Sequence, residues 1–406
     1  MKCGLGRCMP GAAGRRSGRL VSLAVSTAIL TNGLPASAQA PNRPELGRFT
    51  LGADVSALAP PRRVGDGDGA PGSGGRGGAL PPYQENGQRG DEASILKNHG
   101  WNLFRLRVFV SPVRSAPDNS LENTIPLAKK VKGMGAIFLL DLHFSDTWAD
   151  PQHQDIPVAW RELDIDGLEK AWEKHAYDTV KALRDAGAMP DWVQIGNEIT
   201  RGAAWPVGQL QIPGSNRYLP PQPYEEAKQW STLTRLLKAG VLGVKMAAGT
   251  SPVRIAIHID QGGHWEITKW FFDHIKAARV PYDIIAQSFY PPWGHGTLEG
   301  LQQNMRECAR RYGKDFAVVE TGYGRSRIQN NQFMLWPETP EGRVQFLVDL
   351  VNTVRRSPRG ISVMYWAPER DIWNADGTPG PAVFTLDQLT TLDRGPASHA
   401  PAGVHP

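Results

Sequence analysis

Two glutamates that each end a mostly apolar run are the residues of this sequence best suited to chemistry. Glu198 ends the run VQIGNE, and Glu320 ends the run AVVE. Hydrolysis of a glycosidic bond needs two carboxyl groups, because one must protonate the departing oxygen while the other attacks the sugar or activates water. In retaining enzymes the two groups stand about 5–5.5 Å apart, since the second must reach the anomeric carbon. We therefore interpret Glu198 as the acid/base and Glu320 as the nucleophile of a retaining glycosidase.

Polar side chains also end the other apolar runs, and we expect them to surround the two glutamates. Arg105 and Arg107 are two residues apart, so both guanidinium groups project to one side of an extended strand. One of them would lie near Glu320 and favour its ionised form, while the other would bridge strands, and the sequence does not choose between them. Asn197 can hydrogen-bond a sugar 2-hydroxyl, and Tyr290 either hydrogen-bonds the nucleophile or packs in the core. The remaining candidates for substrate contact are Asp141, His143, Asp146 and His258.

Tryptophan is abundant, with 13 in the chain, and several of these residues fall in predicted loops. A flat ring beside a binding site offers an apolar face against which a pyranose ring can pack. We expect Trp148, Trp293 and Trp366, which flank the carboxyl groups, to be such platforms. Three others fall on predicted helices, where core packing is the simpler interpretation: Trp172, Trp230 and Trp270.

These residues need a scaffold that brings distant parts of the chain together. From residue 90 onward, short apolar runs alternate with amphipathic patterns, which is typical of parallel βαβ units. Eight such strands fit a closed (β/α)8 TIM barrel, in which the chemistry takes place at the C-terminal ends of the strands. The predicted strands are 49–55, 103–109, 136–142, 192–195, 254–258, 284–288, 316–319 and 361–366. The clearest predicted helices are 167–186, 224–240, 266–278, 298–312 and 341–355, and Asp91 is positioned to cap an earlier one.

A doubly wound open sheet is the competing architecture. The Gly-rich phosphate-binding turn that often marks such a sheet follows no early strand of this sequence. The zinc motif H-E-x-x-H is also missing, and His143, Asp146 and Asp150 surround a tryptophan that favours a substrate-facing loop over a metal site. The segment 374–377 has oxygen ligands but falls short of a calcium loop. We therefore expect neither a cofactor nor a metal.

The first 40 residues have the organisation of a secretory signal peptide. A basic head precedes an apolar run at 20–34, and the small-residue cleavage patterns ASA and AQA overlap at 36–40. A retained membrane anchor is the alternative, although the run is short and interrupted for a membrane span. We expect removal of this leader, secretion to the periplasm or the extracellular space, and no membrane partner afterwards.

The remainder of the chain, at 41–390, is expected to form one catalytic domain. A Gly- and Pro-rich insertion at about 60–82 cannot bury enough apolar surface to order itself, and we expect a disordered tail at 391–406. The chain has 45 basic and 40 acidic side chains, and five of the basic ones belong to the leader, so the remainder is formally neutral. Charge therefore does not indicate nucleic-acid binding. Cys308, the one cysteine after the leader, cannot form an internal disulfide, and we expect it to be buried on a helix.

The residues named so far are arranged as in glycoside hydrolase family 53, the endo-β-1,4-galactanases, which the chain resembles from about residue 49 to residue 371. The specific stretch is DLHFSDTWADP at 141–151, whereas the Asn-Glu pair at 197–198 alone indicates only the wider clan of barrel glycosidases. Other matching stretches are GADVS at 52–56, RLRVFV at 105–110, QIGNEI at 194–199, QSFYP at 287–291 and VET at 319–321.

This resemblance implies an endo-acting hydrolase of β-1,4-galactan, the side chain of type I arabinogalactan in pectin, which retains configuration without a cofactor. It also implies Glu198 as proton donor and Glu320 as nucleophile. The chain departs from the family pattern after strand six, where it reads WGHGT instead of WHGT, and after strand eight, where WAPE replaces WEPA. Both changes concern the rim, so they bear on the preferred sugar and chain length more than on the reaction.

Two other functions remain open at this point. A related barrel glycosidase, such as a mannanase or a cellulase, would use the same two glutamates on a different β-glycan. A carbohydrate-binding barrel that has lost catalysis is the alternative from another class, and the presence of both Glu198 and Glu320 argues against it. We expect a monomer whose partner is the polysaccharide substrate.

Overall fold

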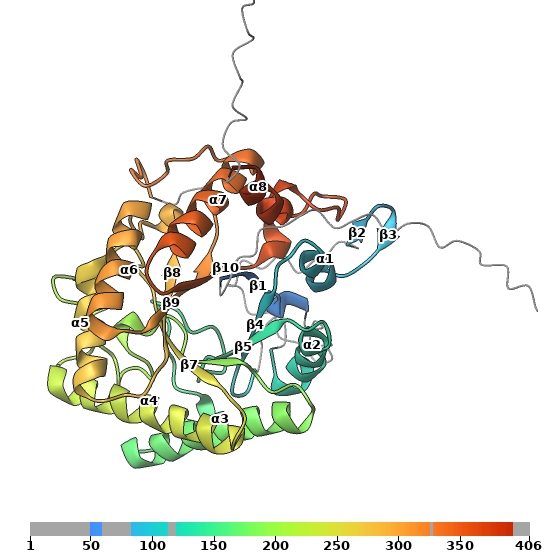
Figure 1. Cartoon of the computed structure of the whole chain (residues 1–406). Helices are drawn as coiled ribbons and strands as arrows, with labels where there is room; N and C mark the ends of the chain where they lie inside the picture. The colour runs from blue at the N-terminus through green and yellow to red at the C-terminus, as the bar shows by residue number, and fades with distance from the viewer. Residues whose placement is uncertain (1–48, 59–82, 113–118, 325–327, 393–406) are drawn as a thin grey trace, which may run out of the picture. The chain divides into compact units, whose positions relative to one another are not determined.

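The computed structural model describes residues 49–58, 83–112, 119–324 and 328–392. Within them, eight parallel strands close into a barrel in the order β1-β10-β9-β8-β7-β6-β5-β4 (Figure 1). This closed sheet confirms the predicted (β/α)8 barrel, and each strand begins and ends within two residues of its predicted bounds. The barrel strands are β1 (Thr50–Asp54), β4 (Leu103–Val108), β5 (Ile137–Leu142), β6 (Trp192–Ile195), β7 (Arg254–Ile259), β8 (Ile284–Phe289), β9 (Asp315–Thr321) and β10 (Gly360–Tyr365).

Helices lie outside the barrel, between successive strands along the chain (Figure 1). The predicted cap of the first helix is present, since the Asp91 carboxylate accepts a hydrogen bond from the Ser94 N–H. The last helix includes residues 391 and 392 of the predicted tail, whereas the leader, the insertion at 60–82 and residues 393–406 lie outside the described residues. The helices are α1 (Glu92–Asn98), α2 (Leu121–Gly133), α3 (Ile165–Asp185), α4 (Glu226–Ala248), α5 (Trp265–Ala277), α6 (Leu298–Tyr312), α7 (Pro340–Arg356) and α8 (Thr385–Leu392).

Helix α4 continues eight residues beyond the end predicted at Gly240. Glycine is a weak helix former, yet Gly240 lies inside the helix here. A Cβ atom at Gly240 would lie 2.9 Å from a methyl carbon of Ile195 in β6. The glycine therefore allows the helix to pack closely on the barrel, and the prediction of a helix end there was wrong.

Alternate side chains of the strands fill the interior of the barrel, as the two-residue period of a strand requires. The apolar cluster that is separate from the helix-facing core consists of Leu103, Leu139, Trp192, Ala256, Ile284, Ala286, Ala317, Val319, Ile361 and Met364. Two residues further along five of these strands, the inward position is polar: Arg105, Asp141, Gln194, His258 and Ser288. The interior therefore changes from apolar to polar toward the C-terminal ends of the strands.

A β-bulge in β9 places Glu320 in this polar layer. Gln287 of β8 pairs with Val318, but the next residue, Ser288, pairs with Glu320, so one extra residue is accommodated in β9. By strict alternation, Glu320 would face away from the interior that Val319 occupies. The bulge reverses the direction of the side chain and brings Glu320 beside Ser288.

The opposite end of the barrel has a cavity of about 420 Å³ near the start of β7 and β8. Its lining includes Lys245 and Lys276, which lie in the last turns of α4 and α5. Cations in these positions compensate the negative ends of helix dipoles, so their presence does not indicate an anion site. In the part of the chain that the structure describes, no helix combines the length and apolar character needed to cross a membrane.

A short hairpin that the sequence did not predict precedes α1. It consists of β2 (Gln84–Glu85) and β3 (Gln88–Arg89), which pair in antiparallel fashion. The N–H of Gln84 donates a hydrogen bond of 3.0 Å to the carbonyl of Gly377, so the hairpin is attached to the long loop that follows β10.

Candidate active site

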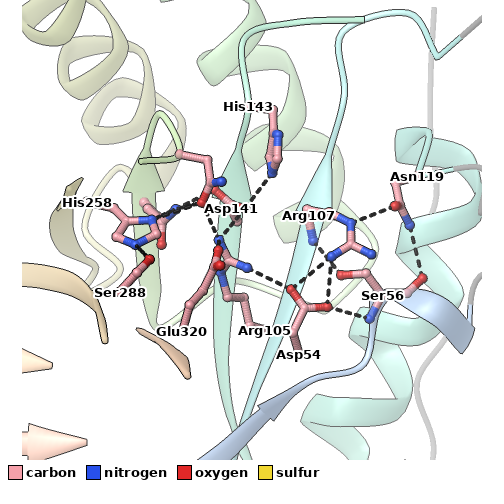
Figure 2. Close-up of polar contacts among 12 residues, drawn as sticks. Asp54, Ser56, Arg105, Arg107, Asn119, Asp141, His143, His258, Ser288 and Glu320 are labelled. Atoms are coloured by element: carbon pink, nitrogen blue, oxygen red, sulfur yellow. Dashed lines mark hydrogen bonds and ion pairs between the residues drawn. The ribbon is translucent and has the colours of Figure 1, made fainter. Parts of the chain in front are cut away.

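One guanidinium group, that of Arg105, connects three strands of the barrel to β4 (Figure 2). Its Nη1 donates a hydrogen bond of 2.8 Å to Asp54 at the end of β1. Its Nη2 lies 2.7 Å from Oδ2 of Asp141 in β5 and 2.8 Å from Oε1 of Glu320 in β9. Burial alone would lower the pKa of Arg105, but the three carboxylates raise it, so the group stays cationic. A buried cation therefore holds Glu320 in place.

Arg107, the other arginine of β4, also contacts the end of β1. Its Nη1 lies 3.3 Å from Oδ1 of Asp54, and its Nε donates a 2.9 Å hydrogen bond to Asn119 (Figure 2). Its guanidinium carbon lies 4.2 Å from the centroid of the Trp148 ring, a distance at which a cation and an aromatic face attract. The alternatives that the sequence left open are thus resolved, with Arg105 beside Glu320 and Arg107 beneath Trp148.

Glu320 has a second partner on the neighbouring strand. The hydroxyl of Tyr290, directly after β8, donates a 3.2 Å hydrogen bond to Oε2 of Glu320, which is one of the two alternatives that the sequence left open for this tyrosine. Glu320 is buried, with only 5% of its surface exposed. Burial raises the pKa of Glu320 to about 7, although the positive charge of Arg105 acts in the opposite direction. As expected, the nearby arginine favours the ionised form, but the effect of burial on the pKa is larger.

Glu198 adopts a backbone conformation that residues with a side chain rarely occupy. Its φ is 47°, in the left-handed region, at the junction between β6 and a short 3₁₀ helix over Ile199–Arg201. Its Oε1 accepts a 2.6 Å hydrogen bond from the hydroxyl of Ser288. Burial raises the pKa of Glu198 well above its ordinary value, and the negative charges of Glu320 and Asp260 raise it further. With a neutral partner in place of a guanidinium, Glu198 is the carboxyl that keeps its proton to higher pH.

Several predicted contact residues position their neighbours in this structure. Asp141 and His258 are fully buried, and their contacts are with protein groups. Oδ1 of Asp141 accepts a 2.7 Å hydrogen bond from Gln194, and Oδ2 lies 2.9 Å from Nε2 of His143. Nδ1 of His258 lies 2.9 Å from Oδ1 of Asn197. A direct contact of any of them with substrate stays a prediction.

Asn197 retains hydrogen-bonding capacity for a ligand. Its Oδ1 lies 2.6 Å from Nη2 of Arg105, and its Nδ2 donates a 2.8 Å hydrogen bond to the carbonyl of Ala149. An amide nitrogen carries two hydrogens, so a second bond from Nδ2 to a sugar hydroxyl is available. Asn197 therefore remains a candidate for the 2-hydroxyl contact.

The residues considered as metal ligands from the sequence have other partners. Asp146 accepts a 2.8 Å hydrogen bond from the N–H of Val158, which fixes the loop after β5. Nδ1 of His143 accepts a 3.0 Å hydrogen bond from the N–H of Ala149, and Asp150 lies 2.9 Å from the ring of His153. In the described ranges, no cluster of three or more His, Cys, Asp or Glu residues could hold a metal ion.

Two of the predicted aromatic platforms, Trp293 and Trp148, each pack on a residue of the polar network, Tyr290 and Arg107 respectively. Trp293 is 43% exposed and lies over Tyr290, with ring centroids 4.3 Å apart. Trp148 covers Arg107 and meets Trp366 edge to face at 6.4 Å. By contrast, Trp172, Trp230 and partly buried Trp270 pack on helices as expected, and Cys308 is buried on α6.

Three polar residues that complete the site were given no role from the sequence: Asp54, Gln194 and Ser288. Asp54 was seen at the end of the first predicted strand, and its position opposite a pair of arginines could have identified it as their partner. Gln194 and Ser288 gave no such signal, because neither side chain carries a charge. Their importance follows from the inward register of β6 and β8, which only the folded barrel shows.

Comparisons with known proteins agree with this geometry. The family model of glycosyl hydrolase family 53 matches residues 51–391. An uncharacterized protein of Niallia circulans is 37% identical over 71% of this chain and 80% of its own length. An arabinogalactan endo-β-1,4-galactanase of Thermothelomyces thermophilus is 31% identical over 70% of this chain and 82% of its own length. A solved fungal β-1,4-galactanase superposes with a TM-score of 0.70 at 27% identity, covering 84% of this chain and 99% of that one. The chain therefore belongs to glycosyl hydrolase family 53, a family of glycosidases.

Proposed function

We propose that this protein is an endo-acting, retaining β-1,4-galactanase in which Glu320 is the nucleophile and Glu198 is the acid/base. The observation that carries the assignment is the difference between the partners of the two buried carboxyl groups. Glu320 has the guanidinium of Arg105 at 2.8 Å, whereas Glu198 has the hydroxyl of Ser288 at 2.6 Å. A cation favours the ionised carboxylate that a nucleophile requires, and a neutral partner leaves the other group protonated.

In the first step, Glu320 forms a bond to the anomeric carbon while the bond from that carbon to the departing oxygen breaks. Glu198 gives its proton to the departing oxygen, so the leaving chain departs as a neutral alcohol. Arg105 and Tyr290 hold the two oxygens of Glu320, which fixes the direction of attack. Nδ2 of Asn197 spends one hydrogen on the carbonyl of Ala149, and we propose that its second hydrogen bonds the 2-hydroxyl as positive charge develops on the ring.

In the second step, Glu198 is ionised and acts as a base. It takes a proton from water, the water oxygen bonds to the anomeric carbon, and the bond from that carbon to Glu320 breaks. The two inversions at the same carbon give net retention. Both carboxyl groups return to their starting protonation states, so no cofactor takes part in the balance.

The proposed substrate is the β-1,4-galactan of type I arabinogalactan. Support comes from relatives whose names are arabinogalactan endo-β-1,4-galactanase and from the fungal β-1,4-galactanase with the same fold. Exposed Trp293, together with Trp148 and Trp366, offers the ring faces that a chain of pyranoses requires. We further propose that the enzyme acts as a secreted monomer after loss of the leader at 1–40.

The test is release of reducing ends from purified galactan, with β-mannan and cellulose as competing substrates. Galactan should be cleaved fastest, and proton NMR should show the β-anomer as the first product. Glu320→Gln should reduce the rate roughly 10⁴-fold, since a neutral amide cannot attack. Ser362→Ala, which removes a buried hydroxyl from β10, is the matched control and should keep the activity. Faster cleavage of mannan or cellulose, or an α-anomer first, would contradict the proposal.

Secretion is tested separately. Expression with and without residues 1–40 should place active enzyme outside the cytoplasm only when the leader is present. N-terminal sequencing of that enzyme should begin near residue 41, whereas an intact N-terminus on membrane-bound protein would support the anchor.

A further inference from the structure

Ser288 lies between Glu198 and a buried histidine. Its hydroxyl is 2.6 Å from Oε1 of Glu198 and 2.9 Å from Nε2 of His258 (Figure 2 shows the histidine and the serine). Both Ser288 and His258 have no exposed surface, so water does not compete for these bonds. Each of the two contacts is within ordinary hydrogen-bond distance.

His258 is neutral, and its other nitrogen is satisfied in either tautomer. Burial lowers the pKa of His258 well below its ordinary value, and the charge of Arg105 lowers it further. Nδ1 lies 2.9 Å from Oδ1 of Asn197, which can accept a hydrogen bond, and 3.0 Å from Nε2 of Gln194, which can donate one. The ring can therefore carry its proton on Nδ1 or on Nε2 without leaving Nδ1 unpaired.

We propose that Ser288 is a positioning residue whose hydroxyl reverses its hydrogen bond each time Glu198 gains or loses its proton, with neutral His258 as the second partner. This inference rests on the proposed function, because it takes Glu198 to be the acid/base. It assigns the reaction a further pair of residues, one of which sequence reasoning overlooked.

Two arrangements follow from the distances. When Glu198 is protonated, its O–H donates to Oγ of Ser288, and the hydroxyl of Ser288 donates to Nε2 of His258. When Glu198 is ionised, the hydroxyl rotates about its Cβ–Oγ bond and donates to Oε1 instead. His258 keeps its proton on Nδ1 in both arrangements, so no proton has to move between its two nitrogens. A hydroxyl can serve both states because it is at once donor and acceptor, whereas an alanine can serve neither.

The charged and titratable groups that face Glu198 come from several strand ends. Glu320 after β9, Asp260 after β7 and Asp150 after β5 raise the pKa of Glu198, and burial raises it most. The hydrogen bond from Ser288 acts in the opposite direction. The remaining neighbours are Tyr290, whose own pKa is raised by burial and by the two glutamates, and neutral His258. Loss of the hydroxyl therefore raises the pKa of Glu198 further.

The experiment compares Ser288→Ala with Ser288→Thr, which keeps the hydroxyl. The basic limb of the kcat/KM profile reports the ionisation of the acid in the free enzyme. With galactan, Ser288→Ala should shift the midpoint of this limb to higher pH by about half to one unit. It should also lower kcat/KM about tenfold. Ser288→Thr should keep the wild-type limb. With a dinitrophenyl β-galactobioside, whose leaving group needs no proton, kcat/KM of Ser288→Ala should stay within about twofold of wild type.

Controls separate a structural effect from the proposed one. Ser362→Ala removes an equally buried hydroxyl and should leave the limb in place. If Ser288→Thr does not fold, Ser288→Cys, with its weaker donor, should give a limb between those of wild type and Ser288→Ala. An unmoved basic limb in Ser288→Ala, or an equal loss of rate on both substrates, overturns the role of Ser288.

Glu198→Gln distinguishes that failure from failure of the proposed function. If Glu198 is the acid, this variant loses the basic limb and keeps most of its kcat/KM on the dinitrophenyl substrate. If Glu198→Gln retains the wild-type profile, the acid/base assignment itself is wrong, and the inference falls with it.

Discussion

Nη2 of Arg105 lies 2.8 Å from Oε1 of Glu320, and both side chains are almost fully buried. The same guanidinium also meets Asp54 and Asp141, so one cation is surrounded by three carboxylates. A buried charge that loses its partner is costly, and the carboxylate left behind takes up a proton instead. The charge state of Glu320 therefore depends on its contact with Arg105.

We predict that Arg105→Lys keeps the fold but loses most of the activity. A lysine carries a single ammonium group, which cannot reach the three carboxylates in the fixed geometry of a planar fork. The rate on galactan should fall roughly 100-fold, and the acid limb of the pH profile should move to higher pH as the pKa of Glu320 rises. Arg311→Lys is the matched control, because Arg311 makes a two-pronged pair with Asp273 on the surface. An Arg105→Lys profile that overlies that of Arg311→Lys would contradict the prediction.

A second prediction concerns the pH optimum. The proposed mechanism requires Glu320 to be ionised and Glu198 to be protonated. Because burial raises the pKa of Glu320 to about 7, activity should rise with pH through neutrality. It should fall again only where Glu198 ionises, at a higher pH. A profile of kcat/KM between pH 4 and 10 measures both limbs, and an acid limb with its midpoint below about pH 5 would contradict the raised pKa of Glu320.

Much of the scaffold was predictable because strand and helix patterns are local. The strand bounds follow from apolar runs whose length a buried parallel strand dictates. The position of Glu198 and Glu320 at the ends of two such runs was enough to suggest the chemistry, since barrel strands share one C-terminal end. The contact of Tyr290 with Glu320 was one of two alternatives for the same reason, and core packing was the other.

The finer arrangement of the site depends on register, which the sequence does not display. Glu320 faces the interior because of one extra residue in β9, and no residue type marks that bulge. Ser288 contacts Glu198 across 90 positions of sequence, and it has no charge to attract notice. Gly240 shows the converse error, since a residue that ends many helices serves here to bring a helix close to β6.

Trp293 provides a prediction about substrate binding. The residue is 43% exposed and its ring stacks on Tyr290, so the other face is available to a sugar. Trp293→Ala should raise KM for galactan about tenfold, with a smaller change in kcat, because stacking contributes to the ground state and the transition state alike. Trp293→Phe should keep part of the affinity. Leu242→Ala, which alters an exposed apolar side chain on α4, should leave KM unchanged. A fall in kcat without a change in KM would argue against a sugar platform.

The last prediction concerns stability and Glu369, which follows β10. Its side chain is 11% exposed, and burial raises its pKa to about 7 from an ordinary 4.5. Between these two pH values the folded chain binds more protons at this site than the unfolded chain, so the carboxyl destabilises the fold progressively as pH rises. Glu369→Gln does not titrate. The difference in unfolding free energy, variant minus wild type, should therefore increase by about 3 kcal/mol between pH 4.5 and 8. Urea denaturation at several pH values measures this difference.

Glu266→Gln is the control, because the side chain of Glu266 on α5 is 80% exposed, and this variant should show no such trend. A pH-independent difference for Glu369→Gln would refute the prediction.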